Sequence, residues 1–116
     1  MPPDHTRIAL PQGSLDMLIL RTLLLGPRHG YAIARHLHSA SGAFLQVEEG
    51  SLYPALHRLE RRRLIAAEWG PSEANRRAKF YALTRAGKKA LEVETNAWQE
   101  MQRAIGNVMN YRPVET

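Results

Sequence analysis

The sequence contains no cysteine among its 116 residues, which excludes disulfide bonds and thiolate zinc sites. It also lacks a long apolar run, because the most apolar stretch, LDMLILRTLLLG, is interrupted by Asp16, Arg21 and Thr22. A transmembrane helix needs about 20 consecutive apolar residues, so none is expected. The first residues, MPPDHTRIALPQGS, have no apolar segment typical of a signal peptide, and we therefore expect a cytoplasmic protein.

Convergent catalytic groups are scarce as well. The five histidines are scattered, and His36 and His38 are two positions apart on a predicted helix, so they point away from each other and cannot chelate one metal ion. Acidic side chains are few, and no nucleophile stands beside a recognisable base. We expect neither an enzyme nor a metal sensor, and no cofactor.

Positive charge is present and is concentrated in one segment. The formal net charge is +5. Residues 57–89 carry ten basic and three acidic side chains, a surplus of seven, whereas residues 1–56 carry four of each. Residues 90–116 carry two basic and four acidic side chains. A localised basic surface favours a polyanionic partner, most often nucleic acid, although a solvated charged surface is an equally simple explanation.

The first half of the sequence predicts two helices. Ser14 is a suitable N-cap for a helix that runs to Leu25 and stops at Gly26–Pro27. This helix is apolar over most of its circumference, so it should be central in the fold. A second helix starts near His29–Gly30 and ends before Gly42. The following AFLQV segment, residues 43–47, is either a strand or an extended connector.

A third helix is predicted in EEGSLYPALHRLERRR, residues 48–63, and its proline indicates where it starts. Proline lacks an N–H, and its ring collides with the carbonyl four residues earlier. Both problems disappear if the helix begins near Ser51 as the N-cap, which places Pro54 in the first turn. At about 100° per residue, the helix then has an apolar face of Leu52, Ala55, Leu56 and Leu59 and a polar face of Tyr53, Pro54, His57, Arg58 and Arg61.

A hairpin and a long helix complete the chain. LIAAEW (64–69) and AKFYALT (78–84) are strand-like and flank the turn-forming GPSEANRR (70–77). Thr84 should cap a helix from about Arg85 to about Asn110. Its apolar residues form a seam with alternating spacings of three and four, in which Glu94 fills a gap. The members of this predicted dimerisation seam are Leu91, Trp98, Met101, Ile105 and Val108.

The order helix, helix, helix, hairpin, helix predicts a winged helix-turn-helix, a mainly α fold with a small β-hairpin. In such a fold the second helix of the helix-turn-helix enters the DNA major groove. We divide the chain into an irregular arm (1–13), a winged-helix DNA-binding domain (14–84), a dimerisation helix (85–110) and a tail (111–116).

GSLYPALHRLERRRLI, NRRAKFYALTRAGKKAL and LDMLILRTLLLGPRHGYAIARHL together resemble the PadR family of bacterial transcriptional regulators. The resemblance covers about residues 13–110, and the short chain is similar to the subgroup with a single C-terminal helix. It implies a homodimer, usually a repressor, that binds inverted-repeat operators in double-stranded DNA through a dimer held by the C-terminal helix. In some members a small, often aromatic, molecule releases the DNA.

The DNA-binding side chains are expected on the third helix and the hairpin. Tyr53 either touches a phosphate or a thymine methyl group or packs on the domain surface, and Ser51 either only caps the helix or also reaches a phosphate. His57 and Arg58 are candidates for base edges, with phosphate or solvent as the alternative. Arg61, one turn further along the third helix, is expected at the DNA backbone, and Pro54 is a further DNA-binding candidate on the same face. Arg76, Arg77 and Lys79 on the hairpin either bind phosphates or belong to a solvated loop. Arg62 and Arg63 should complement the C-terminus of the helix.

Trp98 has two interpretations. It is either a core residue of the dimer or, with its symmetry mate, one wall of a cavity for a flat aromatic effector. A different class of function also stays open, namely a winged-helix protein–protein module that does not read DNA.

Overall fold

The computed structural model describes residues 12–114. The expected arm therefore lies outside the described residues up to position 11, as do the last two residues of the expected tail. The chain forms four helices and one small sheet in this order: α1 (Gln12–Leu24), β1 (Arg28–His29), α2 (Gly30–Ala40), α3 (Glu49–Arg61), β2 (Ile65–Pro71), β3 (Arg77–Leu83) and α4 (Arg85–Met109). This is the expected winged helix with a long final helix, with one strand more than the sequence indicated.

Helix α1 is central, as its apolar circumference predicts. It packs against α2, α3, α4 and β3, and four of its side chains belong to the core, namely Leu15, Ile19, Leu20 and Leu23. The N-cap assigned to Ser14 is wrong, because the helix already starts at Gln12 and Ser14 lies inside it. The first N–H groups of a helix have no partner within it, so water can satisfy them without a side-chain cap.

Helix α3 also starts earlier than expected. The Glu48 carbonyl accepts hydrogen bonds from the N–H groups of Ser51 and Leu52, so the first turn closes before Ser51 and that residue is not the N-cap. Pro54 is consequently inside the helix. Its ring denies the Gly50 carbonyl an intrahelical partner, and this is tolerated because Gly50 is exposed and its carbonyl can bind water. The 43–47 segment is an irregular connector and not a strand.

The C-terminus of α3 is closed by a Schellman motif that uses arginine at the usual glycine position. Arg62 is the C-cap, and Arg63 has a φ of 60°, in the left-handed region. The Arg63 N–H donates to the Glu60 carbonyl at 2.9 Å, and the Leu64 N–H donates to the Leu59 carbonyl at 3.0 Å. Both arginines thus lie at the helix end, as expected.

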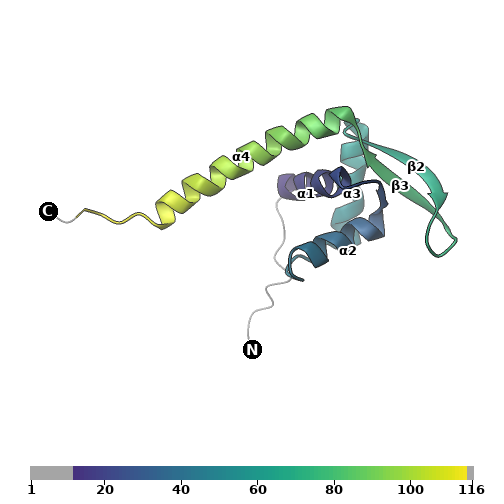
Figure 1. Cartoon of the computed structure of the whole chain (residues 1–116), viewed down its shortest axis with the longest axis horizontal. Coiled ribbons are helices and arrows are strands. Elements are labelled where there is room, and N and C mark those ends of the chain that lie inside the picture. Colours follow the sequence, from purple (N-terminus) through teal and green to yellow (C-terminus); the bar gives the residue numbers. More distant parts are fainter. Residues whose placement is uncertain (1–11, 115–116) are drawn as a thin grey trace.

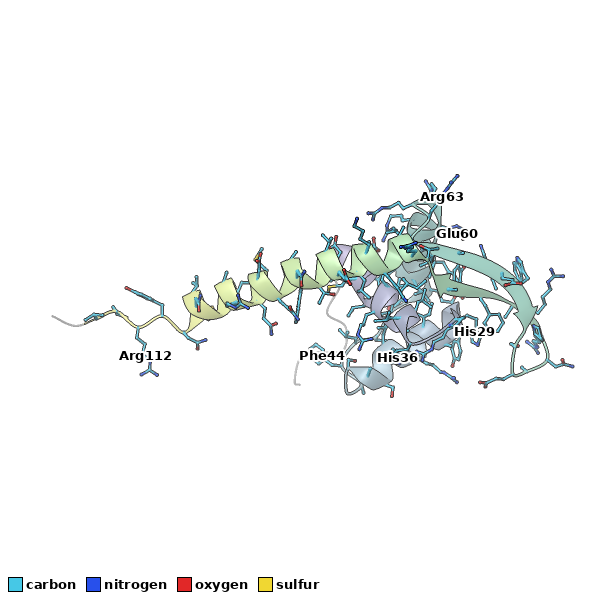
Figure 2. The ribbon with its side chains drawn as sticks, turned by 45° about the horizontal axis from the view of Figure 1, so that its top comes forward. His29, His36, Phe44, Glu60, Arg63 and Arg112 are labelled. Carbon is cyan, nitrogen blue, oxygen red and sulfur yellow. The ribbon has the colours of Figure 1, made fainter. Side chains whose placement is uncertain are left out.

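Thr84 connects this turn to α4. Its hydroxyl accepts a hydrogen bond from the Gly87 N–H at 3.0 Å, which confirms the predicted N-cap, and donates to the Arg63 carbonyl at 2.8 Å. Gly87 is buried because α4 approaches the end of α3 closely. A Cβ at Gly87 would collide with the Leu64 carbonyl. Figure 2 shows Arg63 and Glu60 at this junction, beside the start of α4 and the base of the β2–β3 hairpin.

The sheet has the order β1-β3-β2, with antiparallel neighbours. Strand β1 was not predicted, since its two residues, Arg28 and His29, carry no periodic pattern. Strands β2 and β3 pair from Ile65 with Leu83 to Pro71 with Arg77. The tip, residues 72–76, is therefore shorter than the predicted 70–77. Figure 1 shows this hairpin, the wing, projecting from one end of the helical core and α4 from the other.

Candidate nucleic-acid interface

Helix α3 divides into two faces as its sequence predicts. The apolar residues Leu52, Ala55, Leu56 and Leu59 are almost completely buried. Tyr53, Pro54, His57 and Arg61 are exposed on the other side, and Ser51 is exposed in the first turn. The apolar face thereby anchors the helix in the hydrophobic core, and the polar face stays exposed to solvent. A helix needs this arrangement to enter a DNA groove.

Tyr53 is partly packed on its own domain and partly exposed. A Cβ on Gly30, the first residue of α2, would lie 3.0 Å from Cε1 and 3.1 Å from the hydroxyl oxygen of Tyr53, so the close approach depends on glycine. The side chain nevertheless remains 39% exposed. Tyr53 therefore packs against the start of α2 with the hydroxyl end of its side chain, while part of the residue stays exposed to solvent.

The wing carries an aromatic residue that the sequence reasoning did not select. Trp69 is 56% exposed, and the guanidinium of Arg77 lies 5.6 Å from the centre of its ring. This cation–π pair holds the arginine over the wing surface. The signal was available in the sequence: Trp69 and Arg77 flank the same turn, where hairpin strands bring such residues together. Arg76 is exposed at the tip.

Helix α2 adds a second aromatic–basic pair that sequence reasoning missed. Arg35 lies 5.2 Å from the ring centre of the exposed Tyr31, at the helical spacing of four residues. His29 caps the same helix, because its Nδ1 accepts a hydrogen bond from the Ala32 N–H at 3.2 Å. The His29 ring also stacks with the Tyr31 ring, with 6.5 Å between their centres, and makes a T-shaped contact with the Phe80 ring at 5.5 Å, which joins α2 to the sheet.

A groove of about 470 Å³ separates α3 from the wing. Its walls come from β1, α2, α3, β2 and β3 and are aromatic, basic or small, with no carboxylate among them. The principal lining side chains are Tyr31, Tyr53, His57, Trp69, Arg77 and Lys79. A hollow with this lining suits a polyanionic strand that offers phosphates to the cations and sugars or bases to the rings.

Two of the sequence-predicted contacts are engaged in ion pairs inside the protein. The Arg58 guanidinium (Nη2) donates to Asp16 Oδ1 of α1 at 2.9 Å, and Lys79 Nζ donates to Glu60 Oε1 at 3.1 Å. Both cations are only partly exposed. Tyr53, His57, Arg61, Arg76 and Arg77 thus form the more accessible part of the candidate surface.

The hydroxyl of Tyr81 lies beneath this surface and stays neutral. Its burial raises its pKa above the usual value of 10.0, against the smaller opposing effect of Lys79, whose Nζ lies 5.5 Å from the ring centre. A tyrosine is already neutral at ordinary pH with its usual pKa, so this hydroxyl adds no negative charge to the groove.

The distal part of α4 carries an exposed apolar strip. Leu91 does not belong to it, since that side chain is only 5% exposed and lies in the core of the protomer. This placement corrects the predicted seam, and its physical reason is that the first turns of α4 pack on α1. The strip, defined here as Trp98, Met101, Ile105 and Val108, is largely open to solvent.

Residues 12–114 offer neither a metal site nor a membrane span. No three histidine or acidic side chains of this region lie together in a way that could hold a metal ion. None of the helices within the same range has the length and apolar character needed to cross a membrane.

Known proteins are similar to this chain in sequence or in fold. A protein X of Lysinibacillus sphaericus is 32% identical over 94 residues, which cover 81% of this chain and 86% of that protein. A 37.1 kDa protein of a Streptomyces fradiae transposon is 40% identical over 93 residues, which cover 80% of this chain but only 24% of that protein. The crystal structure of a PadR family transcription regulator from Clostridium difficile R20291 superimposes with a TM-score of 0.73 at 30% identity, over 83% of this chain and 98% of that one.

The family model that matches this chain is decisive for its class. Residues 19–93 match the transcriptional regulator PadR-like family, a span that contains the second half of α1, the whole of α2, α3 and the wing, and the start of α4. The family and its solved structures are regulators and not enzymes. This chain belongs to the PadR-like family of DNA-binding transcriptional regulators.

Proposed function

We propose that the protein is a homodimeric repressor that binds an inverted-repeat operator. The observation that supports this most is the continuous aromatic and basic surface formed by the exposed face of α3, the groove and the wing. Helix α3 enters the major groove, and the wing follows the neighbouring backbone. Repression is the sign of regulation that the family resemblance favours, since a dimer on an operator blocks access to the DNA beneath it.

Within this interface each residue has a defined role. Tyr53 and His57 face base edges or thymine methyl groups, while Arg61 meets the backbone one turn further along. Arg76 and Arg77 bind phosphates from the wing. Other residues at the margin of the surface are Ser51 and Pro54 in the first half of α3, and Tyr31 and Arg35 on α2.

Dimerisation uses the exposed apolar strip of α4. Four large apolar side chains on one helix face, far from the core of their own protomer, are costly to leave in water. Packing against the same strip of a second copy buries them and relates the two α3 helices by a two-fold axis. An inverted repeat has the same symmetry, with half-sites about one helical turn, ~34 Å, apart.

The test is selection of bound sequences from random duplex DNA, followed by salt titration of the best site. We expect enrichment of an inverted repeat. If the dimer neutralises about 8 phosphates, log affinity should fall with log salt at a slope of about −7. A flat salt dependence without enrichment would favour the alternative, a winged-helix protein–protein module.

A flat aromatic effector at Trp98 forms a finer part of the proposal. Trp98 is about half exposed in one chain and lies on the α4 strip, so its symmetry mate would stand close by in the dimer. In the Trp69→Phe variant Trp98 is the only tryptophan. The test is to titrate this variant with planar aromatic compounds and to follow its tryptophan fluorescence. We expect quenching together with weaker operator binding, and the absence of both would remove the effector from the proposal.

A further inference from the structure

Two carboxylates restrain cations on opposite flanks of α3. At about 100° per residue, Arg58 and Glu60 lie on either side of the exposed ridge of Tyr53, His57 and Arg61. On one flank Arg58 bonds Asp16 of α1, and on the other Glu60 bonds Lys79 of β3. The α3 surface therefore contains more cations than it presents to a partner.

The Asp16–Arg58 pair is half-buried and incomplete. The side chains are 16% and 31% exposed, respectively, and Nη2 of Arg58 donates to Oδ1 of Asp16 at 2.9 Å. Nε of the same guanidinium is buried and has no hydrogen-bond partner among the described residues. In a bidentate pair, two guanidinium N–H groups would donate to the two carboxylate oxygens. Arg58 thus donates a hydrogen bond to Asp16 but keeps an N–H group without an acceptor. A phosphate oxygen would compete with Asp16 for this guanidinium.

We infer that Asp16 limits the affinity of the protein for DNA by holding Arg58. This inference rests on the proposed function. The carboxylate acts in two ways: it neutralises a cation at the edge of the DNA-facing ridge, and it places a negative charge where phosphates would pass. Asp16 is a positioning residue in this scheme, since it need not touch DNA.

Glu60 exerts the same restraint on Lys79 more weakly. Its side chain is 36% exposed, more than twice the value for Asp16, so solvent and salt screen the pair more effectively. Lys79 also rests against Tyr81. We therefore expect removal of the Asp16 charge to have the larger effect.

The experiment measures the salt dependence of binding to a labelled duplex of about 30 base pairs, long enough for two half-sites one turn apart. Asp16→Asn should bind more tightly than the wild type at low salt. One released arginine in each protomer of a dimer steepens the slope of log affinity against log salt by about 2. The advantage of the variant should consequently shrink by about tenfold between 50 and 200 mM salt.

Two control variants separate release of Arg58 from other effects. Glu100→Gln makes the same change in net charge on an exposed part of α4, and it should leave the slope unchanged. The double variant Asp16→Asn/Arg58→Gln replaces the ion pair by two amides and restores the wild-type net charge. It should return to within about twofold of wild-type affinity, with the wild-type slope.

Three results would overturn the inference. The first is an unchanged slope or weaker binding for Asp16→Asn, which would mean that Asp16 supports Arg58 in a contact already made. The second is a loss of affinity in the double variant, which is informative even if Asp16→Asn alone does not fold. The third is a wild-type protein that binds no duplex at 50 mM salt, an outcome that removes the proposed function as well.

Discussion

The wing end of the molecule and the distal half of α4 expose large side chains in different ways. At the wing end the exposed rings of Trp69 and Tyr31 each carry an arginine at cation–π distance. Along α4 the exposed strip of Trp98, Met101, Ile105 and Val108 is apolar throughout. The first surface suits a charged, hydrated partner that offers flat groups. The second suits the same strip of another copy, packed against it without intervening water.

The largest expected effect comes from breaking the α4 strip. Met101→Lys combined with Ile105→Lys places four like charges at a dimer contact, so gel filtration should give a single chain of 13.1 kDa. Loss of the paired half-site should weaken operator binding by a factor of about 100 or more. The matched control is Asn96→Lys with Gln99→Lys, which adds the same two charges to exposed positions on the outer side of the same helix. A monomer with full operator affinity would contradict the view that the wing end binds DNA only as part of a dimer joined through α4.

The next effect concerns the junction that joins the two regions. Gly87→Ala should destabilise the protein by about 3 kcal/mol, because the added methyl group meets the Leu64 carbonyl and Leu83 where neither can yield easily. Gly106→Ala in the same helix is the control. The nearest atom to its Cβ is 3.9 Å away, so alanine should be neutral or stabilising by up to about 1 kcal/mol. Urea unfolding followed by circular dichroism measures both, and equal stabilities would show that α4 does not depend on this approach.

A smaller effect distinguishes the cations of the two ends. Arg77→Ala should reduce the slope of log affinity against log salt by about 2 for a dimer, because each wing loses one phosphate contact. Arg112→Ala removes the same charge near the far end of the chain (Figure 2) and should leave the slope unchanged. Fluorescence anisotropy at several salt concentrations gives both slopes. If both variants change the slope equally, net charge governs binding and the location of Arg77 on the wing does not matter.

The smallest expected effect is at the turn after α3. Arg63→Gly should be more stable than Arg62→Gly by about 1 kcal/mol or more, because only Arg63 has a φ of 60° and glycine adopts that conformation freely. The two variants lose the same charge at the same helix end, so the comparison isolates the backbone. Thermal melting detects the difference, and the opposite order would mean that the left-handed turn is not formed in solution.

The sequence predicts those parts of the fold that local patterns determine. The faces of α3, the cap at Thr84 and the α4 helix are local, because each depends on residues within a few positions of one another. Strand β1 is not local, since its two residues become a strand only by pairing with Tyr81 and Phe80. The sequence placed the start of α3 too late. Pro54 is most easily accommodated in the first turn of a helix, but it does not fix the residue at which the helix begins.

The candidate site was predictable to the same extent. The exposed ridge of Tyr53, His57 and Arg61 follows from helical periodicity. The engagement of Arg58 does not, because its partner Asp16 is 42 residues away and comes near only through the packing of α1 on α3. Leu91 is a further case: it fits the heptad spacing, yet the protomer buries it in its own core.

Hydroxyl-radical footprinting of the wild-type protein on a selected operator tests the central claim most directly. Two chains joined through α4, each with one α3 in a major groove, should protect two segments related by a dyad and centred about 10 base pairs apart on one face of the duplex. A single protected segment, or protection without two-fold symmetry, would contradict the account.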